Sequence, residues 1–284
     1  MISQKINKFA KQITSEIIGN KKVGPYHHMV FAVGDIAAHA KPGNFVAISV
    51  GGEGSAMVLR RAFAIYRAVD KGVLGGTIEL VVAPHGAGSK WLTNLNMGDF
   101  VDLIAPLGTA FGIPTTNANT MLIGGGYGSA PLFALAEVLK NRGCRVDMVL
   151  GASTANKIYA PLEGKRSVSS LTLTTDDGTA GIHGQITESI PRLIREFGTE
   201  VIYSCGPMPM LESINKIAND FDILHQCSVE ESMACGIGVC MTCVVPMKLD
   251  NEVKMIRTCL EGPVMDGSAI IWDRKIAMEL MQRP

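Results

Sequence analysis

The sequence predicts a chain in three parts: an antiparallel β domain, a parallel α/β domain and a small cysteine-rich domain. From Met29 to about Phe111, short β-rich runs alternate with turns that contain glycine and proline. From Thr120 to Ala218, short apolar strands alternate with helical segments, as in parallel sheets covered by helices. Beyond these, four of the seven cysteines crowd into one short stretch. The length of 284 residues agrees with about two domains plus a small third one.

Composition limits the classes of partner. The 26 basic and 26 acidic residues give a formal net charge of zero, so no global field attracts nucleic acid or an anionic membrane. Charged residues make up only 18% of the chain, which favours association with another protein. No apolar run reaches 18 residues. An odd number of clustered cysteines is typical of metal chemistry in a reducing compartment, so we expect a cytoplasmic protein.

The N-terminal segment predicts an extra helix. Ile2, Ile6, Phe9 and Ile13 follow one another at spacings of four, three and four, as on one helical face. We therefore expect residues 1–22 to form an extension that packs on the body of the protein. A basic helix lying on a membrane surface is the alternative.

Four strands are expected in the β-rich part, and they predict an antiparallel barrel or sandwich. They cover Phe45–Val50, Ala62–Ala68, Thr77–Ala83 and Phe100–Ile104.

The α/β part predicts four strands, which cover Thr120–Ile123, Val146–Leu150, Leu171–Thr174 and Glu200–Ser204. Three helices are expected between and after them, over Pro131–Lys140, Ile186–Phe197 and Met208–Ala218. A last strand is expected at Ala269–Trp272.

The cysteine cluster carries the most specific spacing in the chain. Cys235, Cys240, Cys243 and Cys259 are spaced C-x4-C-x2-C-x15-C, and the first three match plant-type [2Fe–2S] ligation. Gly236 and Gly238 allow backbone N–H groups to approach the sulfur atoms. A zinc site is the alternative, although zinc ligands usually come in two close pairs. Two further cysteines, Cys144 and Cys227, are expected in the core.

Two strand-end turns predict a nucleotide site. The glycine-rich turn 124–128 lies between a strand and a helix, where a phosphate can approach the backbone closely. Cys205, Gly206 and Pro207 end another strand of the same sheet. Since ligands bind beyond the carboxyl ends of such strands, both turns point to one crevice. A tight turn and a buried thiol are the simpler interpretations.

In the β-rich part, Arg60 and Arg61 adjoin a strand and can hold a pyrophosphate by charge-assisted hydrogen bonds. The turn 86–89 opens a short helix expected at Lys90–Leu95, whose N–H groups can meet a second phosphate. A solvated arginine pair and a simple loop are the alternatives. Directly after the strand ending at Leu150, residues 151–157 contain no arginine to bind a 2′-phosphate and Lys157 is the nearest cation, which favours NAD. Ser153, Thr154 and Lys157 keep NADP as an alternative.

The order of these motifs resembles the ferredoxin reductase superfamily, and more narrowly the electron-transfer subunits of NAD-linked dihydroorotate dehydrogenases. The resemblance extends from about residue 24 to the C-terminus. It rests on R-A-F-A at 61–64, G-G-G-Y-G at 124–128, T-D-D-G-T at 175–179, C-G-P-M at 205–208 and the stretch 230–264 with the four cysteines.

The resemblance implies a six-stranded FAD-binding barrel at 23–113, an NAD-binding domain at 114–222 and a [2Fe–2S] domain at 223–284. Flavin contacts are expected from Arg61, Ala62, Phe63, Ala64, Val81, Val82, Ala83, Gly88 and Ser89. Nicotinamide nucleotide contacts are expected from Gly124, Gly125, Gly126, Gly128, Asp176, Gly206 and Pro207, with Cys205 at the reacting ring. The family usually has R-P-x-S in the flavin motif, so Ala62 and Ala64 depart from it and Ala64 lacks the usual hydroxyl.

The implied function is electron transfer. A partner subunit with FMN oxidises dihydroorotate in pyrimidine biosynthesis, and electrons pass through the [2Fe–2S] cluster and FAD to NAD+. The resemblance thus implies an oxidoreductase subunit of a hetero-oligomer such as a heterotetramer, inactive on dihydroorotate alone. The alternatives are a related flavin and iron–sulfur reductase that serves a ferredoxin, an oxygenase or a sulfide system, and a zinc-stapled nucleotide-binding module without redox activity.

Overall fold

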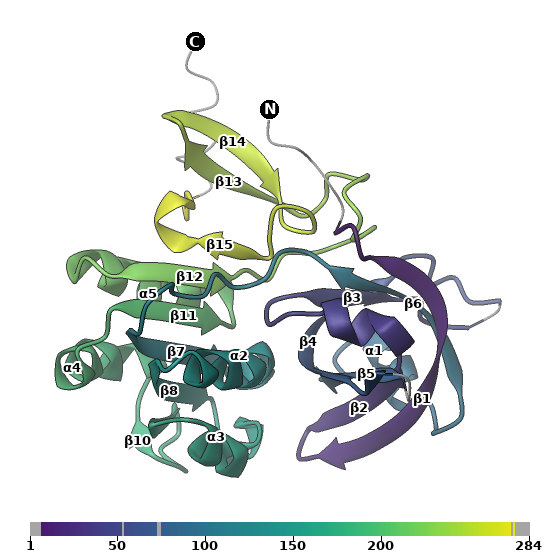
Figure 1. Ribbon diagram of the computed structural model, residues 1–284, viewed down its shortest axis with the longest axis horizontal. Coiled ribbons are helices and arrows are strands. Elements are labelled where there is room, and N and C mark those ends of the chain that lie inside the picture. The colour runs from purple at the N-terminus through teal and green to yellow at the C-terminus, as the bar shows by residue number, and fades with distance from the viewer. Residues whose placement is uncertain (1–6, 53, 73–74, 274, 276–284) are drawn as a thin grey trace.

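The computed structural model describes residues 7–52, 54–72, 75–273 and 275. Its first part is a closed barrel in the strand order β1-β2-β5-β4-β3-β6, and every pair of neighbours is antiparallel. The strands are β1 (Lys11–Val23), β2 (Tyr26–Ala32), β3 (Phe45–Ile48), β4 (Arg61–Asp70), β5 (Gly76–Val82) and β6 (Phe100–Leu107). The short helix α1 (Ala87–Thr93) lies between β5 and β6 in the chain. A six-stranded antiparallel barrel is therefore confirmed (Figure 1).

The predicted N-terminal helix is wrong, because residues 11–23 form the first barrel strand. Ser15 and Ile17 are buried at alternating positions, and the Ser15 hydroxyl donates to the carbonyl of Ala32 at 2.7 Å. Strand β1 pairs with both β2 and β6 and so closes the barrel. The barrel begins inside the segment 1–22 that the sequence assigned to an extension. Ile2 and Ile6 lie outside the described residues.

The second part is a seven-stranded sheet in the order β10-β9-β8-β7-β11-β12-β15, parallel except for the β12–β15 pair. Its strands are β7 (Asn119–Gly125), β8 (Arg145–Ala152), β9 (Ser170–Thr175), β10 (Ile182–His183), β11 (Val201–Cys205), β12 (Leu224–Ser228) and β15 (Val264–Asp266). The helices are α2 (Ala130–Asn141), α3 (Pro161–Ser167), α4 (Ile186–Phe197) and α5 (Met208–Asp220).

Helices cover both faces of this sheet, as predicted (Figure 1). Along β7 the side chain of Leu122 joins the apolar cluster that contains α2, whereas Met121 and Ile123 join the cluster of α4 and α5. The α2 cluster also includes Tyr66 of the barrel, whose ring meets Phe133 edge-on at 5.7 Å between centroids. The barrel and the α/β part therefore share one apolar core, which fixes their relative position.

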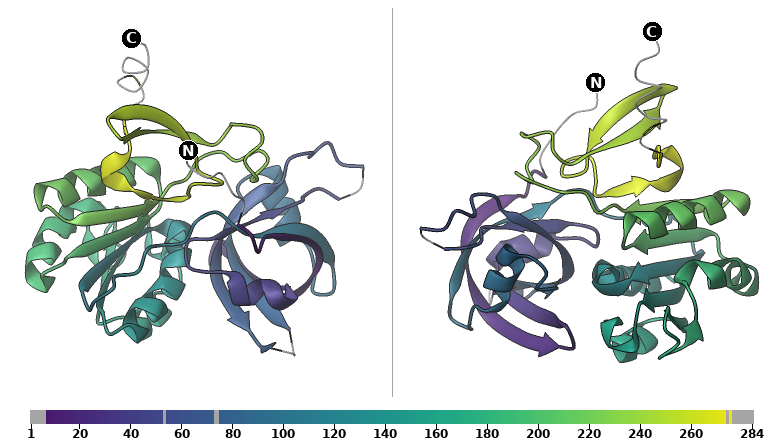
Figure 2. Two further views of the ribbon diagram at one scale, coloured as in Figure 1. Left: turned by 45° about the horizontal axis from the view of Figure 1, so that its top comes forward. Right: turned by 180° about the vertical axis from the view of Figure 1, so that it is seen from behind.

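The third part is the hairpin β13 (Val244–Leu249) and β14 (Glu252–Arg257), which lies above the junction of the other two parts (Figure 2). The strand expected at Ala269–Trp272 is wrong. The chain joins the sheet edge earlier, as β15, and then turns at the short 3-10 helix Gly267–Ala269. After this turn the chain meets the hairpin: Ile270 forms an isolated antiparallel bridge with Met247, and the N–H of Ile271 donates to the carbonyl of Pro246.

Cys144 and Cys227 are 7% and 0% exposed, so their predicted place in the core is confirmed. No helix in the described part of the chain is long and apolar enough to cross a membrane.

Candidate functional site

Two neighbouring cavities lie where the barrel meets the carboxyl ends of the parallel strands. The larger has a volume of about 670 Å³ and the smaller about 160 Å³. Four residues line both of them: Tyr127, Gly128, Gly206 and Glu230. The cavities therefore adjoin each other, and two bound ring systems could meet at these four residues.

The two strand-end turns meet at the larger cavity. A Cβ atom on Gly128 would lie 2.9 Å from the Cα of Gly206, so the turn after β7 contacts the turn after β11. Gly126 has a φ of +56°, a conformation that favours glycine. Gly125, Gly126, Gly128, Gly206 and Pro207 line the larger cavity, whereas Gly124 packs beneath the turn, against Ser129.

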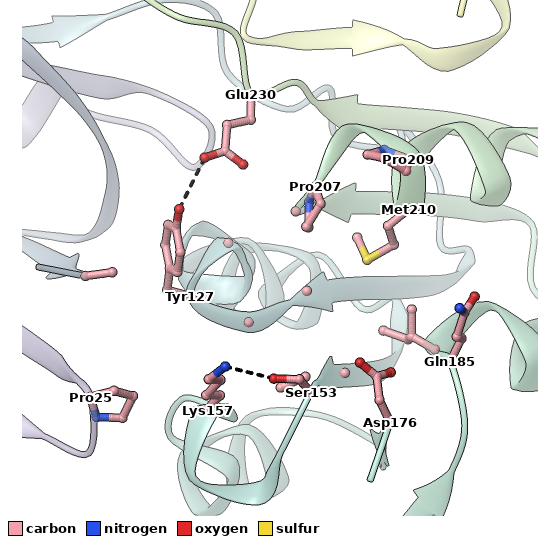
Figure 3. A pocket seen from close by; sticks show the side chains of 18 of the residues that line it. Pro25, Tyr127, Ser153, Lys157, Asp176, Gln185, Pro207, Pro209, Met210 and Glu230 are labelled. Atoms are coloured by element: carbon pink, nitrogen blue, oxygen red, sulfur yellow. Dashed lines mark hydrogen bonds between the residues drawn. The ribbon is translucent and has the colours of Figure 1, made fainter. Parts of the chain in front are cut away.

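The other end of the larger cavity carries polar groups suited to a ribose. Ser153, Lys157 and Asp176 line it, and the Lys157 ammonium donates to the Ser153 hydroxyl at 3.0 Å (Figure 3). The Asp176 carboxylate can accept hydrogen bonds from ribose hydroxyls but would repel a 2′-phosphate. Lys157, at the same end of the cavity, carries the opposite charge and suits a phosphate.

The smaller cavity is lined by the barrel residues predicted to contact a flavin. Ala62, Phe63, Ala64 and Val81 face it, together with Phe45 of β3. Ala83 lines the larger cavity, and Val82 packs instead in the barrel core. Ala62 and Ala64 are exposed, and their small side chains leave the β4 backbone accessible from this cavity.

Arg61 and the Gly88 turn lie together, although they are far apart in the sequence. A Cβ on Gly88 would lie 3.1 Å from Nε of Arg61 and 2.9 Å from Val50. The Arg61 guanidinium donates to the carbonyl of Leu59 at 2.7 Å, whereas Arg60 forms an ion pair with Asp102. Arg61 therefore lies against the glycine turn that also contains Ser89, and these three predicted flavin contacts line neither of the two cavities.

Cys205 is 8% exposed and lines the smaller cavity. Burial raises the pKa of its thiol to about 12, against which a hydrogen bond with Ser228 acts only weakly. The group therefore stays protonated near neutral pH. It can contact a ligand or donate a weak hydrogen bond but is not a thiolate nucleophile.

Tyr127 and Glu230 form the wall between the cavities. The Tyr127 hydroxyl donates to a Glu230 carboxylate oxygen at 3.3 Å (Figure 3). The rings of Tyr26 and His85 lie 6.0 Å and 5.6 Å from the Tyr127 ring, between centroids. Burial, and then the Glu230 charge, raise the pKa of Tyr127 to about 12, so the phenol is neutral. The motif analysis did not single out either residue, because their meeting depends on the tertiary fold.

The four predicted cluster ligands lie in two thiol pairs. Cys240 lies beside Cys235, and Cys243 lies beside Cys259. Cys243 and Cys259 are buried, whereas Cys240 is exposed. The N–H groups of Ile237 and Val239 point at the Cys235 sulfur at 3.4 and 3.3 Å.

This geometry fits a two-iron centre. In the described residues, no three His, Cys, Asp or Glu side chains lie close enough together to hold a single metal ion. Two pairs of thiolates can instead bind one iron each in a [2Fe–2S] cluster. Gly236 and Gly238, with φ of +71° and +84°, give the tight loop that aims backbone N–H groups at sulfur.

The cluster loop contacts the barrel at the smaller cavity. Cys243 and Cys259 share an apolar cluster with Phe45, Ala47 and Leu107 of the barrel. A Cβ on Gly236 would lie 3.4 Å from Ala47 and 3.7 Å from Phe45. Phe45 also lines the smaller cavity, so that cavity and the cysteine cluster share a neighbouring side chain.

Comparisons with known proteins agree with this geometry. The family model of the iron-sulfur cluster binding domain of dihydroorotate dehydrogenase B matches residues 230–271. A dihydroorotate dehydrogenase B (NAD(+)) electron transfer subunit from Desulforamulus reducens is 31% identical over 266 residues, which cover 93% of this chain and all of the relative. The subunit of the same name from Fusobacterium nucleatum is 33% identical over 81% of this chain and 86% of its own length.

Among solved structures, that of the NADH-dependent reduced ferredoxin-NADP oxidoreductase superposes with a TM-score of 0.79 and 27% identity, over 95% of this chain and 92% of that one. A cytochrome P450 reductase from Amycolatopsis superposes with a TM-score of 0.59 at 22% identity, over 74% and 66% of the two chains, and so shares the fold.

Proposed function

This chain belongs to the family of electron transfer subunits of NAD-dependent dihydroorotate dehydrogenase B, and we propose that it carries electrons from an FMN-containing partner subunit to NAD+. In this role it is the oxidoreductase subunit that links dihydroorotate oxidation, a step of pyrimidine biosynthesis, to the nicotinamide pool. The observation that carries the proposal is the placement of three sites in a row. The cysteine loop contacts Phe45, Phe45 lines the smaller cavity, and the smaller cavity adjoins the larger.

The smaller cavity is assigned to the flavin ring of FAD. Ala62, Phe63, Ala64 and Val81 would contact the ring, while Arg61 with Gly88 and Ser89 would hold the pyrophosphate. Since Ala64 has no hydroxyl, only backbone groups of β4 are available to hydrogen-bond the ring edge there. When bound, FAD takes up or releases electrons in pairs or singly, whereas a [2Fe–2S] cluster carries them one at a time.

The larger cavity is assigned to NAD(H). Its glycine turns, 125–128 and 206, would receive the phosphates and the nicotinamide ring, and Asp176 would hold a ribose. Glu230, which lines both cavities, and Cys205, which lines the smaller cavity beside Gly206, would face the reacting ring of the nicotinamide. Cys235, Cys240, Cys243 and Cys259 would be the four cluster ligands.

The cluster loop is the face that we assign to the partner subunit. Cys240 is exposed, and its neighbours Val239 and Met241 are 76% and 51% exposed. Exposed apolar side chains beside a redox site suit a docking surface, because close approach speeds electron transfer and burial stabilises the contact. We therefore propose a cytoplasmic hetero-oligomer, such as a heterotetramer, with this loop at the interface.

We propose functional units at 23–113 for FAD, 114–222 for NAD and 223–284 for the cluster, with β1 added to the first unit because it closes the barrel.

The test is co-expression with the FMN-containing subunit, followed by an assay of dihydroorotate-dependent NAD+ reduction. We expect the two chains to purify together and to reduce NAD+, and this chain alone to be inactive on dihydroorotate. Turnover of dihydroorotate by the isolated chain would contradict the two-subunit assignment. A chain that holds both cofactors but reduces a ferredoxin and ignores the FMN subunit would point to a related reductase.

A further inference from the structure

Arg257, at the end of β14, joins the two halves of the cysteine site. One nitrogen of its guanidinium, Nη1, donates to the carbonyl of Gly238 at 2.9 Å. The other, Nη2, binds the Glu261 carboxylate at 3.2 Å. Gly238 lies in the loop between Cys235 and Cys240, whereas Arg257 and Glu261 flank Cys259. A single side chain thus connects the loop of the first thiol pair to the turn that carries the last cysteine.

The turn around Cys259 is also held by the backbone of Arg257. The carbonyl of Arg257 accepts hydrogen bonds from the N–H groups of Leu260 and Glu261 at 3.2 and 3.0 Å. Leu260 packs so closely under the loop that a Cβ on Gly238 would lie 2.3 Å from its Cδ1 atom. The loop therefore rests directly on the 257–261 turn, and its position depends on that turn.

The Gly238 carbonyl belongs to the same peptide unit as the N–H of Val239. That N–H points at the Cys235 sulfur at 3.3 Å. A cation on the carbonyl end of a peptide polarises it and strengthens the hydrogen bond donated at the other end. Arg257 is thus linked to the Cys235 sulfur through one peptide unit, without touching it.

Arg257 is largely shielded from water, so its positive charge acts strongly on the groups that it contacts. The side chains of Arg257 and Glu261 are only 12% and 18% exposed, so water screens them little. The guanidinium bonds the cysteine loop through Nη1 and the Glu261 carboxylate through Nη2, so it lies between the two. In the part of the chain that the structure describes, the second Glu261 oxygen is buried without a hydrogen-bond partner, which leaves Arg257 as its neutralising contact.

We propose that Arg257 is a positioning residue that raises the reduction potential of the cluster. Reduction adds one electron to a centre already carrying four thiolates, and no bond is made or broken. Stronger N–H···S hydrogen bonds and a nearby cation stabilise that added negative charge. The proposal rests on the proposed function, since it requires a [2Fe–2S] cluster on Cys235, Cys240, Cys243 and Cys259.

The test is a redox titration of the flavin-loaded full chain, purified without oxygen and followed by electron paramagnetic resonance of the reduced cluster, with iron content measured in parallel. In Arg257→Gln we expect the cluster to be harder to reduce by about tenfold in the equilibrium constant, or about 59 mV for one electron. Arg257→Lys keeps the charge and one donor, so its potential is expected between those of Arg257→Gln and the parent chain. The matched control is Lys254→Gln, which removes a cation from the same strand, where Lys254 pairs with Glu252 at 3.3 Å.

A merely structural role predicts something else: iron is lost from the variants, but any cluster that remains has the parent potential. An unchanged potential in iron-loaded Arg257→Gln would overturn the proposal, as would an equal shift in Lys254→Gln. If Arg257→Gln loses its iron, the potential of the cluster in Arg257→Lys decides whether the proposal holds. Loss of iron from both variants would assign Arg257 to cluster assembly alone, and this result would also overturn the proposal. Failure of the proposed function is distinct: either the parent chain itself shows no cluster signal, or it shows one but does not reduce NAD+ together with the FMN-containing subunit, whatever the potentials of the Arg257 variants.

Discussion

The phenol of Tyr127 donates a hydrogen bond to the carboxylate of Glu230 at 3.3 Å, at the opening between the two cavities. Tyr127 belongs to the glycine-rich turn of the parallel sheet, and Glu230 lies five residues before Cys235. One hydrogen bond therefore connects the nucleotide turn to the segment that leads to the cysteine loop. It also holds a negative charge where the nicotinamide and flavin rings are expected to meet.

This charge predicts a preference for the oxidised nucleotide. The nicotinamide ring of NAD+ is cationic, whereas the reduced ring is neutral, so Glu230→Gln is expected to weaken NAD+ binding about tenfold, or about 1.4 kcal/mol. Binding of a non-reactive tetrahydronicotinamide analogue should change less than twofold. Calorimetry on the flavin-loaded protein measures both affinities.

Two variants act as controls for the Glu230 prediction. Glu212→Gln removes a carboxylate from α5 that pairs with Lys216 at 2.7 Å and lines neither cavity, so both affinities should be unchanged. Tyr127→Phe removes only the hydrogen bond that orients Glu230, and a smaller loss of NAD+ affinity is expected. Equal weakening of both nucleotides in Glu230→Gln would contradict a charge effect.

Flavin retention should depend on Arg61 and on the absence of a side chain at Gly88. Arg61→Gln is expected to weaken FAD binding by about 10- to 100-fold, because a charge-assisted hydrogen bond contributes roughly 1.5–3 kcal/mol. Gly88→Val should empty the site, since its Cβ would lie 2.9 Å from Val50. The flavin content of the purified chains is the measurement. Arg60→Gln, which breaks the ion pair with Asp102, should lower stability yet keep the flavin.

Iron content separates the cluster cysteines from the core cysteines. Cys243→Ser is expected to lose the cluster, because a serine oxygen is a poorer ligand for iron than a thiolate. Cys227→Ser changes an equally buried thiol that lies 3.8 Å from the carbonyl of Met265, and the iron should remain. Retention of iron by Cys243→Ser together with loss of iron from Cys227→Ser would contradict the ligand assignment.

A buried histidine makes the fold sensitive to acid. His225 is 3% exposed, accepts a hydrogen bond from the Ser204 hydroxyl at 2.7 Å and contacts the Asn215 amide oxygen at 3.2 Å through its other nitrogen. Burial lowers the pKa of His225 to about 4, below its ordinary value of 6.5. Between pH 6.5 and 4 the unfolded chain therefore binds the proton more tightly than the folded chain, so stability falls as pH falls.

His225 is expected to contribute about 3 kcal/mol to the free energy of unfolding. This contribution is fully present above pH 6.5 and is lost as the pH falls toward 4. Urea unfolding at pH 7.5 and 4.5 measures it. His225→Gln should be less stable at pH 7.5 but should show a shallower fall with pH than the parent chain. His183→Gln, at an exposed histidine, should follow the parent curve. Parallel curves for all three proteins would show that His225 does not titrate in this range.

Features set by local sequence could be predicted, and those set by tertiary contacts could not. The glycine turns, the helix Ile186–Phe197 and the cysteine spacing each occupy a few consecutive residues, so their patterns are visible in the sequence. The sequence predicts a helix where β1 begins because Ile6, Phe9 and Ile13 follow helical spacing. The alternation of Ser15 and Ile17 indicates a strand only when β2 and β6 are present to pair with it.

The same limit holds for the site. Arg61 and Gly88 could each be proposed from their neighbours in the chain, but their contact depends on the closed barrel. The links from Tyr127 to Glu230 and from Arg257 to Gly238 join residues 103 and 19 positions apart. Neither link leaves a pattern in the sequence.

The most direct test of the electron-transfer role is an oxygen-free titration of the purified chain with NADH, followed by visible absorption. A chain that carries FAD and one [2Fe–2S] cluster in electronic contact should take up about three electrons, two on the flavin and one on the cluster. Both the flavin and the cluster absorption should fall during the titration. An uptake of about two electrons with the cluster absorption unchanged, or no uptake at all, would contradict the proposed path between the cysteine loop and the nucleotide site.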